Sequence, residues 1–128
     1  MRSPSQDTLA GLKVLVVEDS YLIAEHVSEL LIQHGAEVVG PVGRLGPGLK
    51  LVEAGTPVDG ALLDVNLDGE FCFPIAAALA QRSVPFAFLT GYDDSDIIPR
   101  DFADAPRLGK PLDEGQLVRT IAADFGRR

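Results

Sequence analysis

Short apolar runs that end in polar residues constrain the fold of this chain more than any other feature. Residues 61–63 are all apolar, lead straight into Asp64 and are followed by a turn signal at Asp68-Gly69. In open parallel α/β sheets, ligands bind beyond the carboxyl ends of the strands, so such a run predicts a strand that delivers one side chain to a site. Three further runs have this form: residues 14–17 before Glu18-Asp19, residues 86–89 before Thr90-Gly91, and residues 107–109 before Lys110-Pro111.

Helical periodicity between these runs completes the pattern of an α/β fold. Apolar residues recur at helical spacing from Ser20 to the glycine at position 35, and again over residues 113–125. Five strands alternating with helices predict a parallel sheet with helices on both faces. Weaker signals predict a strand at 37–40 closed by Pro41, helices at 47–54 and 74–81, and only a short, easily disturbed helix within the Asp- and Pro-rich residues 93–106.

Length and charge limit the class of protein. The chain has 128 residues, which suits one domain, and its net charge of -8 repels phosphate backbones and anionic lipid. We therefore expect no nucleic-acid or membrane partner. No apolar run approaches the ~20 residues of a membrane span, and residues 1–7 lack the apolar core of a signal peptide. The single cysteine, Cys72, fits a reducing compartment, and we expect a cytoplasmic protein.

The carboxylates at the ends of the first and third strand runs predict a metal site. If these two strands lie side by side, Glu18, Asp19 and Asp64 meet above the sheet and raise one another's pKa values. A hard divalent cation with oxygen ligands relieves that repulsion, and Mg²⁺ suits a site with few protein ligands. Neither His26 nor His34 stands at ligand spacing from the cysteine or a carboxylate, so zinc has no support.

The remaining strand ends carry groups that suit phosphoryl chemistry. An aspartate such as Asp64 can attack a phosphoryl group whose charge a metal and a lysine neutralise. Lys110 supplies a positive charge, Thr90 a hydroxyl that can donate to a phosphoryl oxygen, and Gly91 leaves room beside it. The expected product is an aspartyl phosphate.

The set Glu18-Asp19, Asp64, Thr90 and Lys110-Pro111 resembles the receiver domain of bacterial response regulators over residues 12–126. The resemblance implies a flavodoxin-like (βα)5 three-layer sandwich with a parallel sheet of order 2-1-3-4-5. It also implies a cis Lys110-Pro111 bond and an Asp64 that accepts a phosphoryl group from a sensor histidine kinase or a histidine phosphotransfer protein. Its implied ligands are Asp19, Asp64 and the backbone carbonyl of Asn66 for Mg²⁺, Glu18 through water, and Thr90 and Lys110 for the phosphoryl group.

A narrower resemblance lies in Phe88-Leu89-Thr90-Gly91-Tyr92. It is similar to the Phe-Ala-Thr-Gly-x-Tyr signature of single-domain receivers that work with one class of alphaproteobacterial histidine kinases, although Leu89 replaces Ala and Tyr92 follows Gly91 directly. This likeness implies a stand-alone receiver. We accordingly expect a flexible leader at residues 1–11, a receiver domain at 12–126 and no output domain.

One position departs from the receiver pattern. Most receivers carry an aromatic residue three positions before the lysine, and here that position is Arg107. With Tyr92, Arg107 marks the expected switch region, and residues 93–106 are expected to rearrange in place of the usual aromatic. Asn66 and Tyr92 are expected to flank the path of the water that removes the phosphoryl group.

Other interpretations of these residues stay open at this point. Asp64 or Glu18-Asp19 could cap a turn or helix, Thr90 could be an ordinary turn residue, and Lys110 a surface lysine. Two other functions compete with the receiver: a pseudo-receiver that binds partners without phosphorylation, and a Mg²⁺-dependent aspartyl phosphatase. The phosphatase pattern has two aspartates after the first strand, whereas the nucleophile here follows the third. We therefore expect a signalling module whose only catalysis is its own phosphorylation and dephosphorylation.

Overall fold

The expected strands form one five-stranded parallel sheet in the computed structural model, which describes residues 8–91 and 94–126. In spatial order the sheet is β2-β1-β3-β6-β7, which is order 2-1-3-4-5 when only its own strands are counted along the chain, as predicted. The strands are β1 (Lys13–Val17), β2 (Glu37–Val42), β3 (Gly60–Asp64), β6 (Phe86–Thr90) and β7 (Arg107–Gly109).

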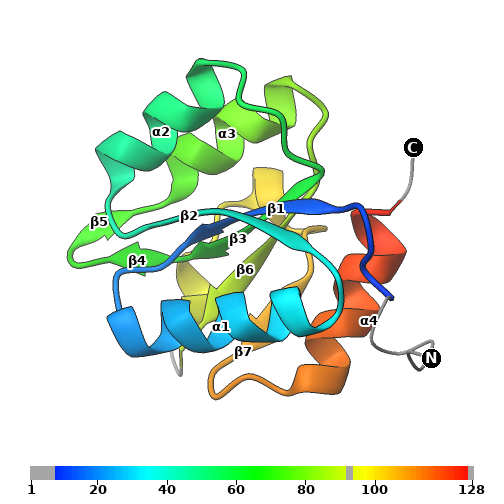
Figure 1. The fold of residues 1–128 in the computed structure, drawn as a ribbon. Helices are drawn as coiled ribbons and strands as arrows, with labels where there is room; N and C mark the ends of the chain where they lie inside the picture. The colour runs from blue at the N-terminus through cyan, green and yellow to red at the C-terminus, as the bar shows by residue number, and fades with distance from the viewer. Residues whose placement is uncertain (1–7, 92–93, 127–128) are drawn as a thin grey trace, which may run out of the picture.

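Four α-helices cover the two faces of the sheet. In Figure 1, α2 and α3 lie over one face and α1 and α4 over the other, which gives three layers. Ser20 caps α1 by accepting a hydrogen bond from the Ile23 N–H, and Asp113 caps α4 in the same way. The helices are α1 (Tyr21–Gln33), α2 (Leu45–Glu53), α3 (Phe73–Gln81) and α4 (Glu114–Asp124).

Burial on both faces explains why the strands are almost wholly apolar. In β1, Val14 and Val16 belong to the core under α1 and α4, while Leu15 and Val17 belong to the core under α2 and α3. A strand covered on both sides has no polar face, so it shows no alternation in sequence. Each central strand can therefore carry polar groups only where it ends.

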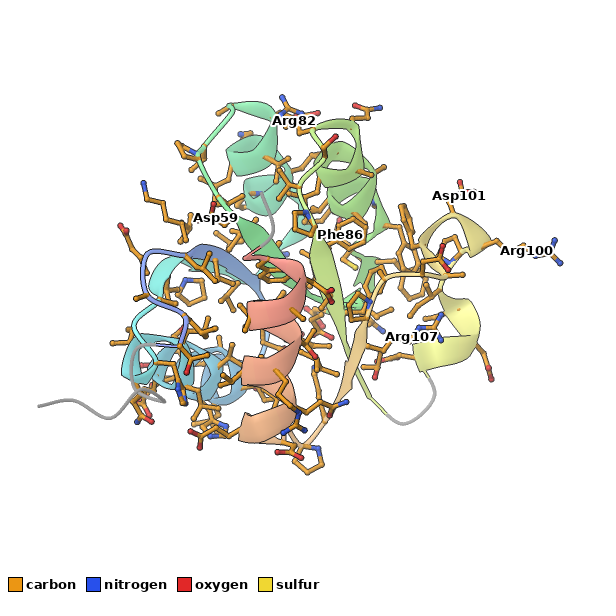
Figure 2. The ribbon with its side chains drawn as sticks, turned by 90° about the vertical axis from the view of Figure 1, so that its right-hand side faces the viewer. Asp59, Arg82, Phe86, Arg100, Asp101 and Arg107 are labelled. Carbon is orange, nitrogen blue, oxygen red and sulfur yellow. The ribbon has the colours of Figure 1, made fainter. Side chains whose placement is uncertain are left out.

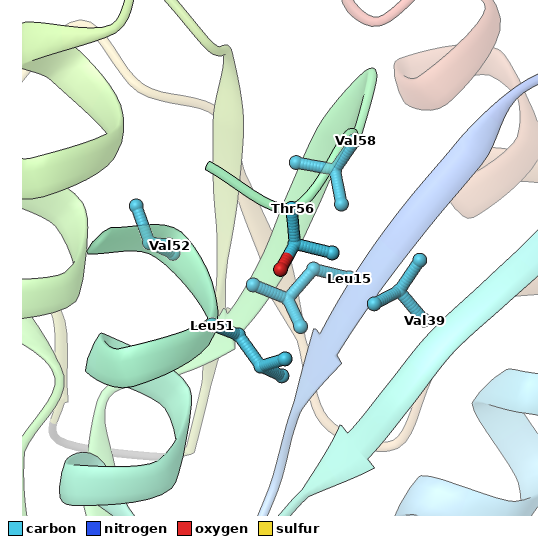
Figure 3. Close-up of a pocket in the computed structure, with 6 residues that line it drawn as sticks. All are labelled: Leu15, Val39, Leu51, Val52, Thr56 and Val58. Carbon is cyan, nitrogen blue, oxygen red and sulfur yellow. The ribbon is translucent and has the colours of Figure 1, made fainter. Parts of the chain in front are cut away.

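The packing of α2 against the sheet is close. Figure 3 shows side chains of β1, β2, α2 and the loop after α2 around a small apolar pocket. That pocket has no space for even a water molecule, so it is a packing defect of the core and not a ligand site.

Among the helices of the described residues, none has the length and apolar character of a membrane span.

The fourth crossover differs from the other three. Between β6 and β7 the described residues form two 3₁₀ turns, η2 (Asp94–Ile97) and η3 (Arg100–Phe102), where a full α-helix would complete five βα units. Aspartate has low helix propensity and Pro99 cannot continue a helix. The prediction that any helix within residues 93–106 would be short is confirmed by these 3₁₀ turns.

Three further details correct the sequence prediction. β2 does not stop at Pro41 but continues to Val42 through a cis Gly40-Pro41 bond, which an edge strand tolerates. The loop expected after Asp64 contains a two-stranded hairpin of β4 (Asn66–Leu67) and β5 (Glu70–Phe71). Leu9, expected in a flexible leader, is fully buried in the core and its N–H donates to the His34 carbonyl at 2.8 Å.

The close approach of β3 to α4 gives a stability test. A Cβ at Gly60 would lie 2.3 Å from the ring of Phe125, which is fully buried. We expect Gly60→Ala to lower the free energy of unfolding by about 2–3 kcal/mol, because the ring has no space to move into. In the matched control Gly46→Ala, the new Cβ meets nothing within 4 Å, and stability should be unchanged or slightly raised. Urea unfolding of both variants with equal midpoints would contradict this account of the packing.

Candidate functional site

A polar cleft of about 420 Å³ lies where β1 and β3 end. β1 and β3 are paired in parallel, with Val17 opposite Leu63, so the residues that follow Val17 and Leu63 reach the same edge of the sheet. This register brings Glu18-Asp19, after β1, close to Asp64, at the end of β3. The cleft is lined by Asp19, Asp64, Asn66, Asp68, Gly69, Asp94 and Lys110.

Three carboxylates converge at this edge. One oxygen from each of Glu18, Asp19 and Asp64 lies within 4.8 Å of the others. Glu18 and Asp64 are each 3% exposed, whereas Asp19 is exposed to solvent. Glu18 does not line the cleft but lies beside it, where its Oε2 accepts a hydrogen bond from the Ser20 N–H at 3.0 Å. The acidic pair is therefore not the cap of α1, because Ser20 has that role.

Lys110 joins the cluster from β7. Its Nζ lies 2.9 Å from Glu18 Oε1 and 3.1 Å from Asp64 Oδ1. Its backbone N–H donates to the Thr90 carbonyl at 2.8 Å, and the Lys110-Pro111 bond is cis, as the receiver resemblance implies. The lysine is thus held at the cleft by both its backbone and its side chain.

Burial and crowding change the protonation of the cluster. Burial, followed by hydrogen bonds to Glu18 and Asp19, raises the pKa of Asp64 to about 8 in spite of the attraction of Lys110. Burial alone would raise the pKa of Asp19, but its hydrogen bonds to Asp64 and Glu18 lower it. Burial opposes the charge of Lys110, yet its contacts with Glu18 and Asp64 raise the pKa of the ammonium. Asp64 therefore keeps its proton to a much higher pH than an ordinary aspartate does.

This donor set fits a hard divalent cation. The three acids each offer a carboxylate oxygen, one of these residues is open to solvent, and Asn66 lines the same cleft. Oxygen ligands with room for water suit Mg²⁺. A dication would also relieve the repulsion among the three carboxylates, which contributes to the raised pKa of Asp64.

Thr90 and Gly91 stand beside the cleft. Thr90 is buried and its Oγ1 lies 3.5 Å from the Leu108 carbonyl, facing β7 and not the cleft. The Gly91 N–H donates to Asp94 Oδ2 at 2.7 Å. Both residues are at the expected strand end, but neither is among those that line the cleft.

Of the two expected switch residues, the described one, Arg107, does not line the cleft. Arg107 is half-buried at the start of β7, opposite Phe88 in the register, two residues before the end of that strand. Tyr92 lies outside the described residues.

The structure adds Asp68, Gly69 and Asp94 to the site. Asp68 and Gly69 form the turn of the β4–β5 hairpin with φ of +53° and +93°, and the Gly69 N–H donates to Asn66 Oδ1 at 2.7 Å. The Asp-Gly pair in the sequence signals this turn but not that it folds back over the cleft. No sequence feature distinguished Asp94 as a site residue, because it is one of several aspartates in its segment.

Comparison with known proteins begins with curated relatives, since no protein-family model matches the chain. The transcriptional regulatory protein PdtaR of Mycobacterium tuberculosis is 29% identical over 126 residues. The match covers 94% of this chain and 61% of PdtaR, so the chain spans less than two thirds of the curated relative.

Solved structures match over nearly the whole chain. SdrG of Sphingomonas melonis Fr1 is 37% identical with a TM-score of 0.72, covering 88% of this chain and 94% of SdrG. The signal receiver domain of a modulated diguanylate cyclase from Desulfovibrio desulfuricans G20 is 28% identical with a TM-score of 0.79, covering 90% and 94%. The receiver domain of a sensor histidine kinase from Pseudomonas aeruginosa PAO1 holds a magnesium ion in its active-site cleft. It is 22% identical with a TM-score of 0.78, and the match covers 92% of this chain and 100% of that receiver domain. This likeness shows that the two chains share a fold.

The fold, the sheet order and these likenesses agree. The chain has the fold of response-regulator receiver domains and is similar in sequence to the Desulfovibrio signal receiver domain and to the regulatory protein PdtaR, which supports a role in two-component phosphorelay signalling.

Proposed function

We propose that Asp64 is the phosphoacceptor of this receiver and takes its phosphoryl group from a phosphohistidine in the presence of Mg²⁺. The observation that carries the proposal is the contact between a buried carboxylate and a fixed ammonium at the edge of an open cleft. Asp64 Oδ1 and Lys110 Nζ lie 3.1 Å apart there. A lysine in that place can bind an oxygen of a phosphoryl group that approaches Asp64.

In the proposed step, a carboxylate oxygen of Asp64 forms a bond to phosphorus. The P–N bond of the phosphohistidine breaks, and its electron pair leaves with the imidazole nitrogen. Lys110 stabilises the negative charge on the phosphoryl oxygens. Thr90 can donate to one of these oxygens once its hydroxyl turns from the Leu108 carbonyl toward the cleft, and Gly91 leaves space beside it.

Glu18, Asp19 and Asp64 are the residues that would hold Mg²⁺, with the backbone carbonyl of Asn66 as a further ligand. When bound, the metal neutralises charge on the carboxylates and on the phosphoryl oxygens. The magnesium in the cleft of the Pseudomonas receiver supports this assignment.

We further propose that the chain acts as a cytoplasmic, stand-alone receiver of the alphaproteobacterial type. In this role it takes phosphoryl groups from a sensor histidine kinase or a histidine phosphotransfer protein and signals by contact or by phosphotransfer, without turning over an external substrate. In this proposal residues 12–126 are the receiver domain, and SdrG, which matches 88% of this chain over 94% of its own length, supports that assignment.

Phosphoramidate, whose P–N bond resembles that of phosphohistidine, tests the proposal directly. We expect Mg²⁺-dependent formation of an acyl phosphate, seen by ³¹P NMR and removed by hydroxylamine. The Asp19→Asn variant should form it much more slowly, while Glu29→Gln, an exposed acid outside the cleft, should match the unsubstituted chain. Sustained hydrolysis of p-nitrophenyl phosphate would instead favour an aspartyl phosphatase. If phosphoramidate and Mg²⁺ give no acyl phosphate, the proposal is contradicted.

A further inference from the structure

A second groove lies at the other end of the sheet from the polar cleft. It has a volume of about 400 Å³ and begins at Pro85 and Pro106, which directly precede β6 and β7. The cleft with Asp64 lies where the strands end, so β6 separates the two sites along its length. We call this second groove the acidic groove. Its floor includes Phe86, Phe102 and Pro106, and its rim carries Asp101, Asp104 and Asp124.

The acidic groove exists because the fourth crossover lacks an α-helix. Among the described residues of this crossover, η3 is the helical turn that borders the groove, and it places Phe102 against Phe86 with ring centroids 5.7 Å apart. Figure 2 shows Phe86 on the strand side of this region and Asp101 on the η3 side. Phe102 is half-buried at the floor and Phe86 lies buried beneath it, while the rim comes from two separate elements, η3 with its following turn, and α4.

The charge of the acidic groove has one sign. No basic side chain is among its lining residues in the described part of the chain. Arg82, at the end of α3, donates to the Glu53 carbonyl at 3.1 Å on the α2 side, and Arg100 points away from the body of the molecule in Figure 2. Asp124 is the last residue of α4, where the carbonyl ends of the helix add negative potential.

We propose that the acidic groove is a docking site for an arginine-bearing, otherwise apolar segment of a partner protein. Three aspartates that line the same groove as the half-buried ring of Phe102 suit a guanidinium better than an ammonium. A guanidinium is weakly hydrated, stacks on aromatic rings and forms paired hydrogen bonds with carboxylates. The apolar neighbours of that arginine would cover the proline and alanine side chains of the floor. An acidic surface of this kind repels nucleic acid and anionic lipid, so a basic protein segment fits its charge.

A peptide titration followed by amide NMR tests this proposal. The probe is a blocked pentapeptide with one arginine between two leucines, compared with its lysine and glutamine versions and with free arginine amide. We expect the arginine peptide to shift amides around Phe86, Phe102 and Asp104, the lysine peptide to bind more weakly and the glutamine peptide not to bind. Because the acidic groove and Asp64 lie at opposite ends of the sheet, Asp64→Asn should bind the arginine peptide unchanged, whether or not the proposed phosphorylation occurs.

Charge variants locate the site. Asp101→Asn, Asp104→Asn and Asp124→Asn combined should weaken the arginine peptide by about tenfold, since each pair at a solvent-exposed rim contributes little alone. The matched triple variant Glu29→Gln, Glu37→Gln and Glu53→Gln removes the same charge from exposed sites outside the acidic groove and should leave binding unchanged.

Three results would overturn the proposal. Equal binding of the glutamine peptide would show that the carboxylates do not select the ligand. Equal binding of free arginine amide would indicate a site for small cations instead. No shift of the groove amides at millimolar peptide would show that the segment does not dock.

Discussion

Asp64→Asn should stabilise the metal-free protein by about 1–3 kcal/mol at about pH 8.5, and by less at about pH 5. The substitution removes a carboxylate whose ionisation is made costly by burial and by its acidic neighbours. It also removes one partner of Lys110, which keeps the net gain below the full effect of the pKa shift. Glu18 and Asp19 remain, so the lysine still has carboxylates beside it.

The pH dependence follows from the raised pKa. Asp64 has a pKa of about 8 in the folded chain and an ordinary value of 3.8, so the folded state holds this proton more tightly than the unfolded state does. Its contribution to stability is fully present below about pH 4 and is lost as the pH rises through 8. Asparagine does not titrate, so the stability of Asp64→Asn is not lowered in this way. The difference in stability between the variant and the unsubstituted chain should therefore grow as the pH rises from about 4 to about 8.

Thermal unfolding of both chains with EDTA over this pH range measures the effect. Adding Mg²⁺ should then stabilise the unsubstituted chain more than the variant, because only the former keeps all three carboxylates. Glu29→Gln serves as the control for the loss of one negative charge. An Asp64→Asn variant that is less stable at every pH, or whose advantage shrinks as the pH rises, would contradict the description of the cluster.

Lys110→Met should slow phosphorylation of Asp64 by a factor of about 100 or more, the cost of losing one charged group that stabilises a transition state. Methionine keeps much of the length of lysine but offers no donor. The variant should also be less stable without metal, because Glu18 and Asp64 lose the cation that contacts both.

Initial rates with acetyl phosphate, measured beside Lys50→Met, test this role. Lys50 is exposed on α2 and does not line the cleft, so its variant should react at the unsubstituted rate. Lys110→Arg should recover part of the stability, since it keeps a positive charge near the carboxylates. Equal rates for Lys110→Met and Lys50→Met would show that Lys110 acts only in the fold.

The sequence predicted the central part of the fold well, for a physical reason. Strands buried on both faces read as continuous apolar runs, and their polar ends mark one edge of the sheet. Asp64 and Lys110 were therefore found in the sequence, and their meeting required only the strand order that the structure confirms. The same pattern located α1 and α4, whose caps and stripes are local signals.

The remaining parts depend on contacts that local pattern does not encode. Leu9 is one apolar residue in a polar stretch, so nothing marked it as core. The β4–β5 hairpin is too short to show alternation, and its place above the cleft depends on packing around Phe73 and the sheet. Thr90 was placed at the correct strand end, but the direction of its hydroxyl toward Leu108 is set by the neighbouring strand.

Intact-protein mass after incubation with acetyl phosphate and Mg²⁺ tests the central claim most directly. We predict a gain of one phosphoryl group, about 80 Da, that is absent without Mg²⁺ and absent in Asp64→Asn. The same gain in Asp64→Asn would place the phosphoryl group on another residue. No gain in the unsubstituted chain, with either acetyl phosphate or phosphoramidate, would contradict the assignment of Asp64 as the phosphoacceptor.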